Sequence, residues 1–133
     1  MREILFRGKP RHSEKWIEGM LTAKGKSIAV IGQFTDNYTS VQCHTNIAVK
    51  AETVGQYTGL TDKNGNKIFE NDIIRGEYET YIIGFEYGAF GTVDIGHTDV
   101  FPFCDDAYGI NTKEFEVIGN IHDNPELLEA KDD

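Results

Sequence analysis

Cysteine, proline and tryptophan are scarce in this chain of 133 residues, which holds two, three and one of them respectively. Two cysteines so far apart in sequence, Cys43 and Cys104, are too few for a disulfide framework. No apolar run approaches roughly 18 residues, which excludes a transmembrane helix. The opening residues, Met1–Ile4, lack the apolar core of a secretory signal. We therefore expect a protein of the cytoplasm with no membrane association.

Positive charge is also scarce, and it is unevenly placed. The chain has 13 basic and 22 acidic side chains, for a net charge of −9. Residues 1–26 hold seven basic and three acidic side chains, whereas residues 27–133 hold six and nineteen. A negative field repels phosphate backbones, so nucleic acid is a disfavoured partner unless the basic N-terminal segment forms a local site. The excess charge is otherwise typical of a surface that keeps a protein in solution.

The most informative stretch runs from Thr53 to Arg75 and is rich in turn signals. Asn64-Gly65 between apolar-bearing runs predicts a hairpin with a type I′ turn, in which both central residues have φ > 0. Residues 56–60 should then pair with residues 67–69. A second turn is expected at Glu70-Asn71-Asp72, before another strand begins at Ile73. The residues that we predict to set the backbone at these turns are Gly55, Gly59, Asn64, Gly65 and Asp72.

Several segments of the chain together resemble a known family. They are Arg2-Glu3-Ile4-Leu5-Phe6-Arg7, Lys15-Trp16-Ile17-Glu18-Gly19, Thr53–Leu60, Asp62–Gly65, Ile68–Ile74, Glu116–Ile121 and Asn124–Leu128. This pattern resembles the YopX family of proteins encoded by bacteriophages and prophages. The chain departs from the pattern at Ala51, where proline is frequent, and at Asn71, where glycine is common. The resemblance implies a largely β fold and a phage context in a bacterial host, and it brings no catalytic residues.

The remaining pattern predicts short strands separated by turns. We expect strands over residues 3–7, with Ile4 and Phe6 facing inward, and over 15–22, 28–34, 41–49, 73–78, 80–86, 90–95 and 114–121. The continuous apolar run after Ile28 predicts burial on both faces of its strand. Asn124-Pro125-Glu126 predicts a capped C-terminal helix, followed by a frayed acidic tail over residues 129–133. We predict one domain over residues 1–133, mostly β, as an antiparallel meander or barrel-like (YopX-like) fold with a short C-terminal helix.

Metal, cofactor and catalytic sites are not expected. The run Asp62–Asn66 begins like a calcium loop, but the template then requires glycine and glutamate where Lys67 and Ile73 stand. The cysteines and histidines lack the spacing of zinc ligands and of a nucleophile–base pair; they are Cys43, His44, His97, Cys104 and His122. A small hydrolase is the enzymatic alternative, built on the carboxylates of Glu70, Asp72, Glu77, Glu79 and Glu86.

Aromatic side chains allow a second non-enzymatic interpretation. They would form a stacking platform for single-stranded nucleic acid, with phosphate contacts from the basic N-terminal segment. The aromatics concerned are Trp16, Tyr57, Phe69, Tyr78, Tyr81, Phe85, Tyr87 and Phe90. The cations are Arg2, Arg7, Arg11, Lys15, Lys24 and Lys26. At strand spacing such aromatics more commonly form the core and cross-strand pairs.

We therefore predict an accessory protein that is not an enzyme and that acts through protein binding or self-association. Exposed strand edges and aromatics would make the contact, and our candidate residues are Trp16, Phe101 and Phe103. Two alternatives remain open beside it. One is the single-strand-binding module, and the other is an acidic mimic of DNA that inhibits a host protein.

Overall fold

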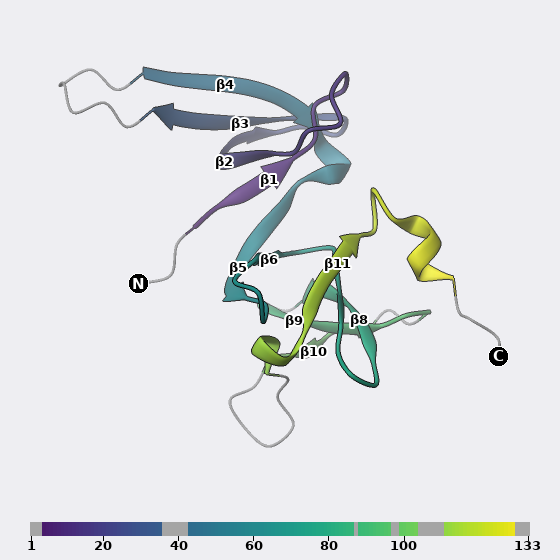
Figure 1. Cartoon of the computed structure of the whole chain (residues 1–133). Helices are drawn as coiled ribbons and strands as arrows, with labels where there is room; N and C mark the ends of the chain where they lie inside the picture. Colours follow the sequence, from purple (N-terminus) through teal and green to yellow (C-terminus); the bar gives the residue numbers. More distant parts are fainter. Residues whose placement is uncertain (1–3, 36–42, 87, 97–98, 104–110, 130–133) are drawn as a thin grey trace. The chain divides into compact units, whose positions relative to one another are not determined.

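The structure is a computed structural model of the whole chain. It describes residues 4–35, 43–86, 88–96, 99–103 and 111–129. These residues form short strands joined by turns and three single turns of 3₁₀ helix (Figure 1). The pairings whose register is defined are antiparallel, which confirms the prediction of a mostly β, antiparallel fold. Closure of the strands into a barrel stays a prediction.

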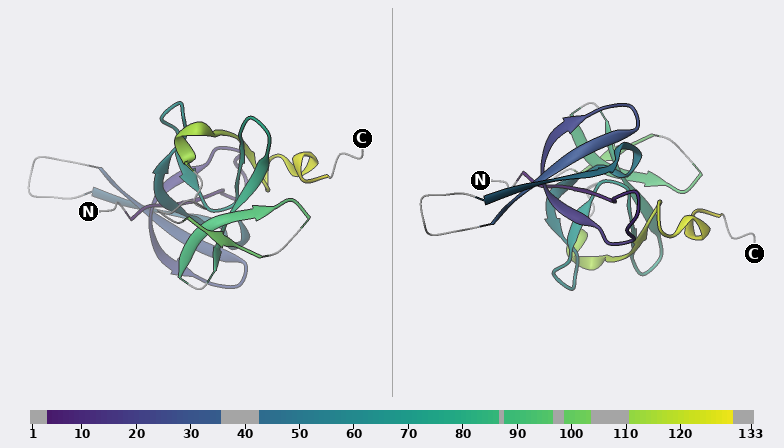
Figure 2. Two further views of the ribbon diagram at one scale, coloured as in Figure 1. Left: turned by 90° about the horizontal axis from the view of Figure 1, so that it is seen from below. Right: turned by 90° about the horizontal axis from the view of Figure 1, so that it is seen from above.

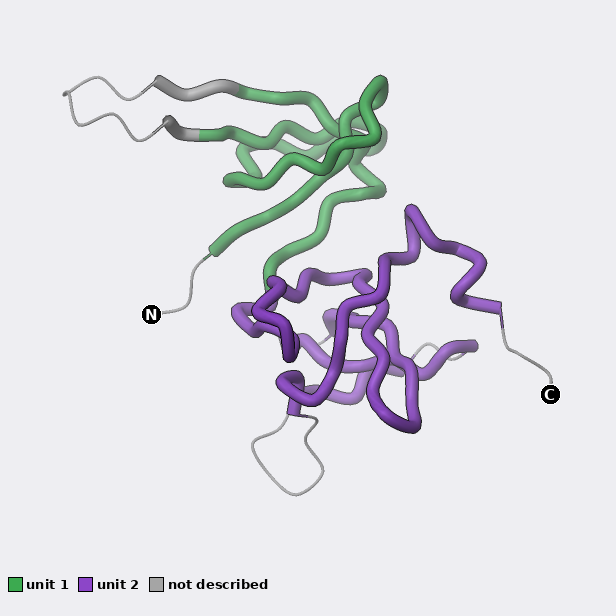
Figure 3. The backbone as a smooth tube through the Cα atoms, in the orientation of Figure 1, with its two compact units in different colours: residues 1–57 green, residues 58–133 purple. Residues whose placement is uncertain are grey.

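The chain divides into two compact units (Figure 3). Unit 1 covers residues 1–57 and unit 2 covers residues 58–133. The division falls inside strand β5, Gly55–Thr61, so each half of that strand belongs to a different unit. The single domain that the sequence predicts stays a prediction, and each unit is described by itself below.

Unit 1 is an antiparallel meander with an added strand. Its elements are β1 (Phe6–Gly8), β2 (Ile17–Lys24), β3 (Ile28–Thr35), β4 (Cys43–Lys50), the 3₁₀ turn η1 (Ala51–Thr53) and the first half of β5. The strands lie in the order β4-β3-β2-β1-β5. β3 and β4 pair along their whole length and run side by side in each view (Figure 2). The first three predicted strands and their meander are thus confirmed.

The core of unit 1 lies on one face of β3 and β4. Ala29, Ile31 and Val49 are fully buried, and Ala51 joins them from η1. Ile28 is 43% exposed and Val30 is half-buried, so the second face of β3 is only partly buried and the prediction of burial on both faces was wrong. A continuous run of apolar residues cannot show whether one or both faces of a strand are buried, because strand side chains alternate between the two faces whatever their chemistry.

The predicted inward orientation of Ile4 was also wrong. Ile4 is 66% exposed, while Phe6 is half-buried. β1 has only three residues, so Ile4 lies beyond its beginning. The position that packs inward is Gly8, where an added Cβ would come within 2.6 Å of Val49 Cγ2.

Unit 2 is built on a second sheet. Its elements are the second half of β5, β6 (Lys67–Phe69), β7 (Asp72–Arg75), β8 (Thr80–Glu86), β9 (Ala89–Asp94), β10 (Phe101–Pro102), the 3₁₀ turn η2 (Thr112–Glu114), β11 (Glu116–Asn120) and the 3₁₀ turn η3 (Pro125–Leu128). The sheet has the order β10-β9-β8-β7-β11, and β6 lies beside β5. Its core consists of Ile68, Ile74, Ile83 and Phe115. Burying each isoleucine contributes about 1.5–3 kcal/mol before chain entropy is subtracted.

Two predicted features of this unit differ in the structure. The C-terminal helix is not confirmed, because η3 is a single 3₁₀ turn and Asn124 makes no side-chain cap hydrogen bond. The type I′ turn was wrong: Gly65 has φ +83°, but Asn64 does not have positive φ. The backbone N–H of Gly65 instead donates to the carbonyl of Asp62 at 3.1 Å. Asp62–Gly65 is thus a β-turn with aspartate first and glycine last, an alternative loop for a hairpin.

Candidate functional site

Asp62 is a buried carboxylate of the first predicted turn, and its hydrogen bonds hold backbone. Its side chain accepts hydrogen bonds of 2.9 Å from the backbone N–H groups of Asn64, Asn66 and Val117. Its side chain is buried, and burial alone raises the pKa of a carboxyl group. The hydrogen bonds to Val117, Asn66 and Asn64 act in the opposite direction and hold the pKa of Asp62 below its ordinary value. We name this arrangement the Asp62 clasp.

Asp72 closes the second turn in a similar way. Its Oδ2 accepts from the backbone N–H of Phe69 at 2.7 Å, and the side chain is 1% exposed. Asn71, between them, has φ +74°, a conformation in which asparagine is tolerated and glycine is common. These contacts explain the polar residues of this turn. The carboxylate of Asp72 therefore binds the backbone of the turn and is not presented to a substrate.

The other predicted turn residues fall into the same hairpin. Gly59 has φ +88° within β5, and Gly55 begins that strand opposite Arg7 of β1. Asn64 contributes its backbone N–H to the clasp, and its side-chain Nδ2 donates a hydrogen bond of 3.3 Å to Oε2 of Glu116. Gly55 and Asp72 therefore begin strands, Asn64 and Gly65 lie in the turn between β5 and β6, and Gly59 lies inside β5.

The carboxylates of the hydrolase alternative do not gather at one place. Glu77 and Glu79 stand in the β7–β8 turn, where with Glu114 they line an open hollow of about 330 Å³. Glu86 lies at the far end of β8, about 20 Å away by strand rise. In the described parts of the chain, no group of three or more His, Cys, Asp or Glu side chains is arranged to hold a metal ion.

Most of the cysteines and histidines lie outside the described residues. His97 and Cys104 fall in undescribed segments, and the side chains of Cys43 and His44 are likewise not described. His122 is half-buried in the turn after β11. Within the described residues, no helix is long and apolar enough to cross a membrane.

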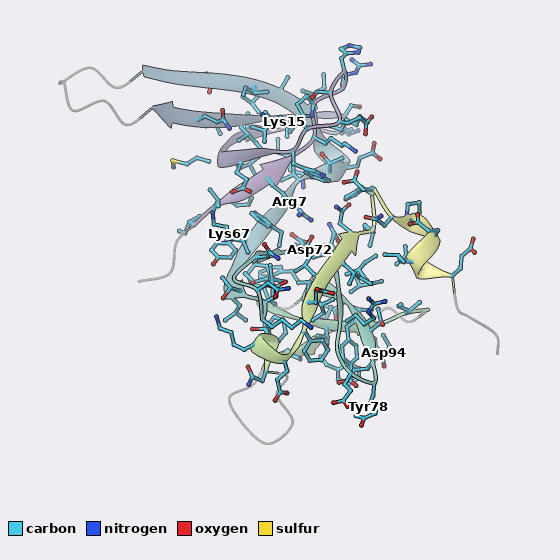
Figure 4. The ribbon with its side chains drawn as sticks, in the orientation of Figure 1. Arg7, Lys15, Lys67, Asp72, Tyr78 and Asp94 are labelled. Carbon is cyan, nitrogen blue, oxygen red and sulfur yellow. The ribbon has the colours of Figure 1, made fainter. Side chains whose placement is uncertain are left out.

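The aromatics of the proposed stacking platform are divided between the two units. In unit 1 the face of Trp16 is occupied by the Arg7 guanidinium, 4.6 Å from the ring centroid, and Lys9 lies at 5.7 Å. Tyr57, Phe69 and Phe90 are buried. Tyr81 is half-buried against Phe115, with ring centroids 5.9 Å apart, and Tyr87 lies outside the described residues. Tyr78 is exposed at the β7–β8 turn (Figure 4).

Exposed aromatics do collect at one end of the sheet of unit 2. Phe85 of β8 pairs directly with Phe90 of β9, and their ring centroids are 4.7 Å apart. Phe101 of β10 stands opposite Thr92 of β9, on the same face as Phe90. Phe85 is 46% exposed and Phe101 is 61% exposed, while Phe90, on the strand β9 between β8 and β10, is 8% exposed. We name Phe85, Phe90 and Phe101 the aromatic edge.

The three residues that the sequence predicts to contact a partner differ in their exposure. Phe101 belongs to the aromatic edge and is the most exposed of them. Phe103 packs on the core of unit 2, and Trp16 is half-buried under its two cations. The sequence placed Phe85 in the stacking platform and not among the protein-contact candidates. Phe85 and Phe90 are register partners of β8 and β9, so the correct register of the predicted hairpin would have revealed the pair.

Comparison with known proteins gives a family and a fold. A family model described as YopX protein matches residues 5–129. No curated protein matches the sequence. Among solved structures, the crystal structure of protein EF1440 from Enterococcus faecalis is similar, with a TM-score of 0.61 at 23% identity, covering 97% of this chain and 100% of that chain. At that identity the similarity establishes the fold alone.

Proposed function

The chain belongs to the YopX protein family, and on that premise we propose that it is a phage- or prophage-encoded accessory protein that binds another protein. We propose further that it is not an enzyme and that it acts in the cytoplasm of a bacterial host. The aromatic edge is the observation that carries the binding proposal. Exposed aromatic side chains on one face of a sheet are typical of interaction sites, because a partner that covers them removes a large apolar surface from water.

The strand that bears Phe101 supports the same role. β10 is the outer strand of its sheet and has two residues, one of them Pro102. Proline and short length discourage pairing through the backbone, so the contact relies on side chains rather than on strand addition. The partner would therefore offer an apolar pocket or ridge to Phe85 and Phe101.

The charge of unit 2 restricts the chemistry of that partner. Residues 58–133 hold five basic and seventeen acidic side chains, a net charge of −12. Two copies meeting through this unit would repel each other, whereas a basic protein surface would be attracted. We therefore propose a partner whose contact surface combines apolar and basic residues.

A second candidate shares this charge observation. An acidic protein that imitates DNA would occupy the nucleic-acid site of a host protein, and the net charge of unit 2 favours it. In that case DNA would compete with this chain for the captured partner. A partner that bound both simultaneously would contradict the mimic and leave the general protein-binding proposal in place.

Affinity capture with matched variants tests the proposal. The immobilised full chain would be incubated with lysate of a lysogenic host, in parallel with Phe101→Ala and Tyr78→Ala. Tyr78 is 87% exposed at the opposite end of β8, so its variant controls for loss of an exposed aromatic side chain. We expect a protein that the wild type and Tyr78→Ala retain and Phe101→Ala loses. Retention by all three would contradict the role of the aromatic edge. Light scattering of the purified chain distinguishes a foreign partner from a second copy.

A further inference from the structure

Unit 1 contains an open hollow of about 460 Å³ that is lined by Arg11, Ser27, Ile28, Lys50 and Glu52. Three separate segments meet there: the loop after β1, the turn into β3, and the junction of β4 with η1. We name it the basic hollow. Neither the family resemblance nor the aromatic edge of unit 2 accounts for it.

Backbone contacts fix the geometry of these segments. The N–H of Lys50 donates to the carbonyl of Lys9 at 2.9 Å, and the N–H of Ala51 donates to the carbonyl of Ser27 at 3.0 Å. Ile28 and Lys50 are also direct partners in the β3–β4 register. The backbone of Ser27 and Lys50 is therefore positioned before any ligand arrives, which lowers the entropy cost of binding.

The cations of the basic hollow have no ion-pair partner among the residues that the structure describes. Among the described residues, neither Arg11 nor Lys50 takes part in an ion pair or side-chain hydrogen bond. Lys9, by contrast, meets Glu14 at 2.8 Å. Lys24, at the end of β2, and Lys26 are exposed in the segment that leads to Ser27. Glu52 is the one acidic lining residue.

We propose that the basic hollow binds a phosphate group. Arginine offers a planar fork of N–H donors, lysine a point charge, and serine a hydroxyl donor. Three donors of different geometry around one hollow suit a tetrahedral phosphate, whose oxygens point in different directions, better than they suit a planar carboxylate. Because the hollow is open, the phosphate can belong to a small phosphomonoester or to the backbone of a single strand.

Nuclear magnetic resonance titration of the full chain tests the site. Sodium phosphate, a mononucleotide and a short oligothymidylate would be added separately to the labelled protein at low salt. We expect shifts at the amides of Ser27, Lys50 and Ala51 with all three. Tighter binding of the oligonucleotide would assign the source as a nucleic-acid backbone, and equal affinity would assign a phosphomonoester; either result supports the phosphate site.

Variants make the test specific. Arg11→Ala and Lys50→Ala should each weaken phosphate binding about fivefold or more, since each removes a charge-assisted contact. Glu52→Gln should strengthen binding, because it removes the acidic lining residue. Lys15→Ala removes the same charge from an exposed position of unit 1 outside the lining and should have little effect. Absence of shifts in the wild type, or equal weakening by Arg11→Ala and Lys15→Ala, would overturn the proposal.

Discussion

The carboxylate of Asp62 accepts a hydrogen bond of 2.9 Å from the backbone N–H of Val117, a residue 55 positions later in the chain. The same side chain organises its own turn through the N–H groups of Asn64 and Asn66. One acidic residue thus joins a local turn to the strand that completes the sheet of unit 2. The most recognisable segment of the sequence is explained by folding, and function must be sought on the surface.

Replacing Asp62 by Asn should destabilise the protein. The amide keeps the shape but loses the charge and presents one acceptor oxygen where the carboxylate has two. Leaving buried N–H groups short of an acceptor costs about 1–3 kcal/mol of unfolding free energy. Urea denaturation at neutral pH would measure it, with Asn64→Ala as a control that keeps the backbone donor. Equal stability of Asp62→Asn and wild type would contradict the clasp.

The same variant should show a particular pH dependence. The pKa of Asp62 is lowered in the folded protein, so its contribution to stability is complete above the unfolded pKa of about 3.9 and is lost as pH falls through the folded value. The stability difference between wild type and Asp62→Asn should therefore be constant near neutrality and shrink below about pH 4. A difference that stayed constant into that acidic range would argue against a lowered pKa.

Tyr81 should titrate at alkaline pH later than a free tyrosine. Its burial raises the pKa, and the negative charges of Glu79 and Asp94 raise it further. Because the folded pKa is the higher one, the stabilisation is present below the ordinary tyrosine pKa of about 10 and is lost as pH rises through the folded value. Comparing tyrosinate absorbance of wild type and Tyr81→Phe would isolate this group. A Tyr81 transition at or below the ordinary value would contradict its placement.

Gly19 should tolerate no side chain. A Cβ at this position would collide with the carbonyl oxygen of Gly32 on the neighbouring strand β3. Strand backbone cannot yield as a flexible side chain does, so Gly19→Ala should cost about 1–3 kcal/mol. Gly25→Ala provides the comparison, since its nearest atom, the carbonyl oxygen of Ile28, would lie at 3.2 Å. Thermal unfolding should rank Gly19→Ala well below Gly25→Ala; the reverse order would contradict the packing.

The two exposed phenylalanines should differ in their structural importance. Phe85 packs against Phe90 with the two rings tilted by 59°, and such a pair contributes about 0.5–1.5 kcal/mol beyond its area burial. Phe101 is more exposed, so Phe101→Ala should change stability by only about 0.5 kcal/mol. Denaturation midpoints check both. If Phe101→Ala proved as destabilising as Phe85→Ala, Phe101 would be a packing residue and the binding proposal would lose its main evidence.

The sequence predicted the positions of the strands better than it predicted which of their faces are buried. The hairpin of β8 and β9 and the meander of unit 1 follow from alternation and glycine-rich turns, which are local signals. The exposure of Ile4, the incomplete burial of the second face of β3 and the contact of Asp62 with Val117 depend on partners far along the chain. The basic hollow could not be predicted, because Arg11, Ser27 and Lys50 come together only through the pairing of three segments.

The most direct test of surface-mediated action is calorimetric titration of the captured partner with wild type, Phe101→Ala and Tyr78→Ala. Hot-spot aromatics typically contribute more than about 1–2 kcal/mol to binding, so Phe101→Ala should weaken the affinity at least about tenfold. Tyr78→Ala should match the wild type, and added salt should weaken all three because the partner is expected to be basic. Equal affinity of wild type and Phe101→Ala would contradict the account.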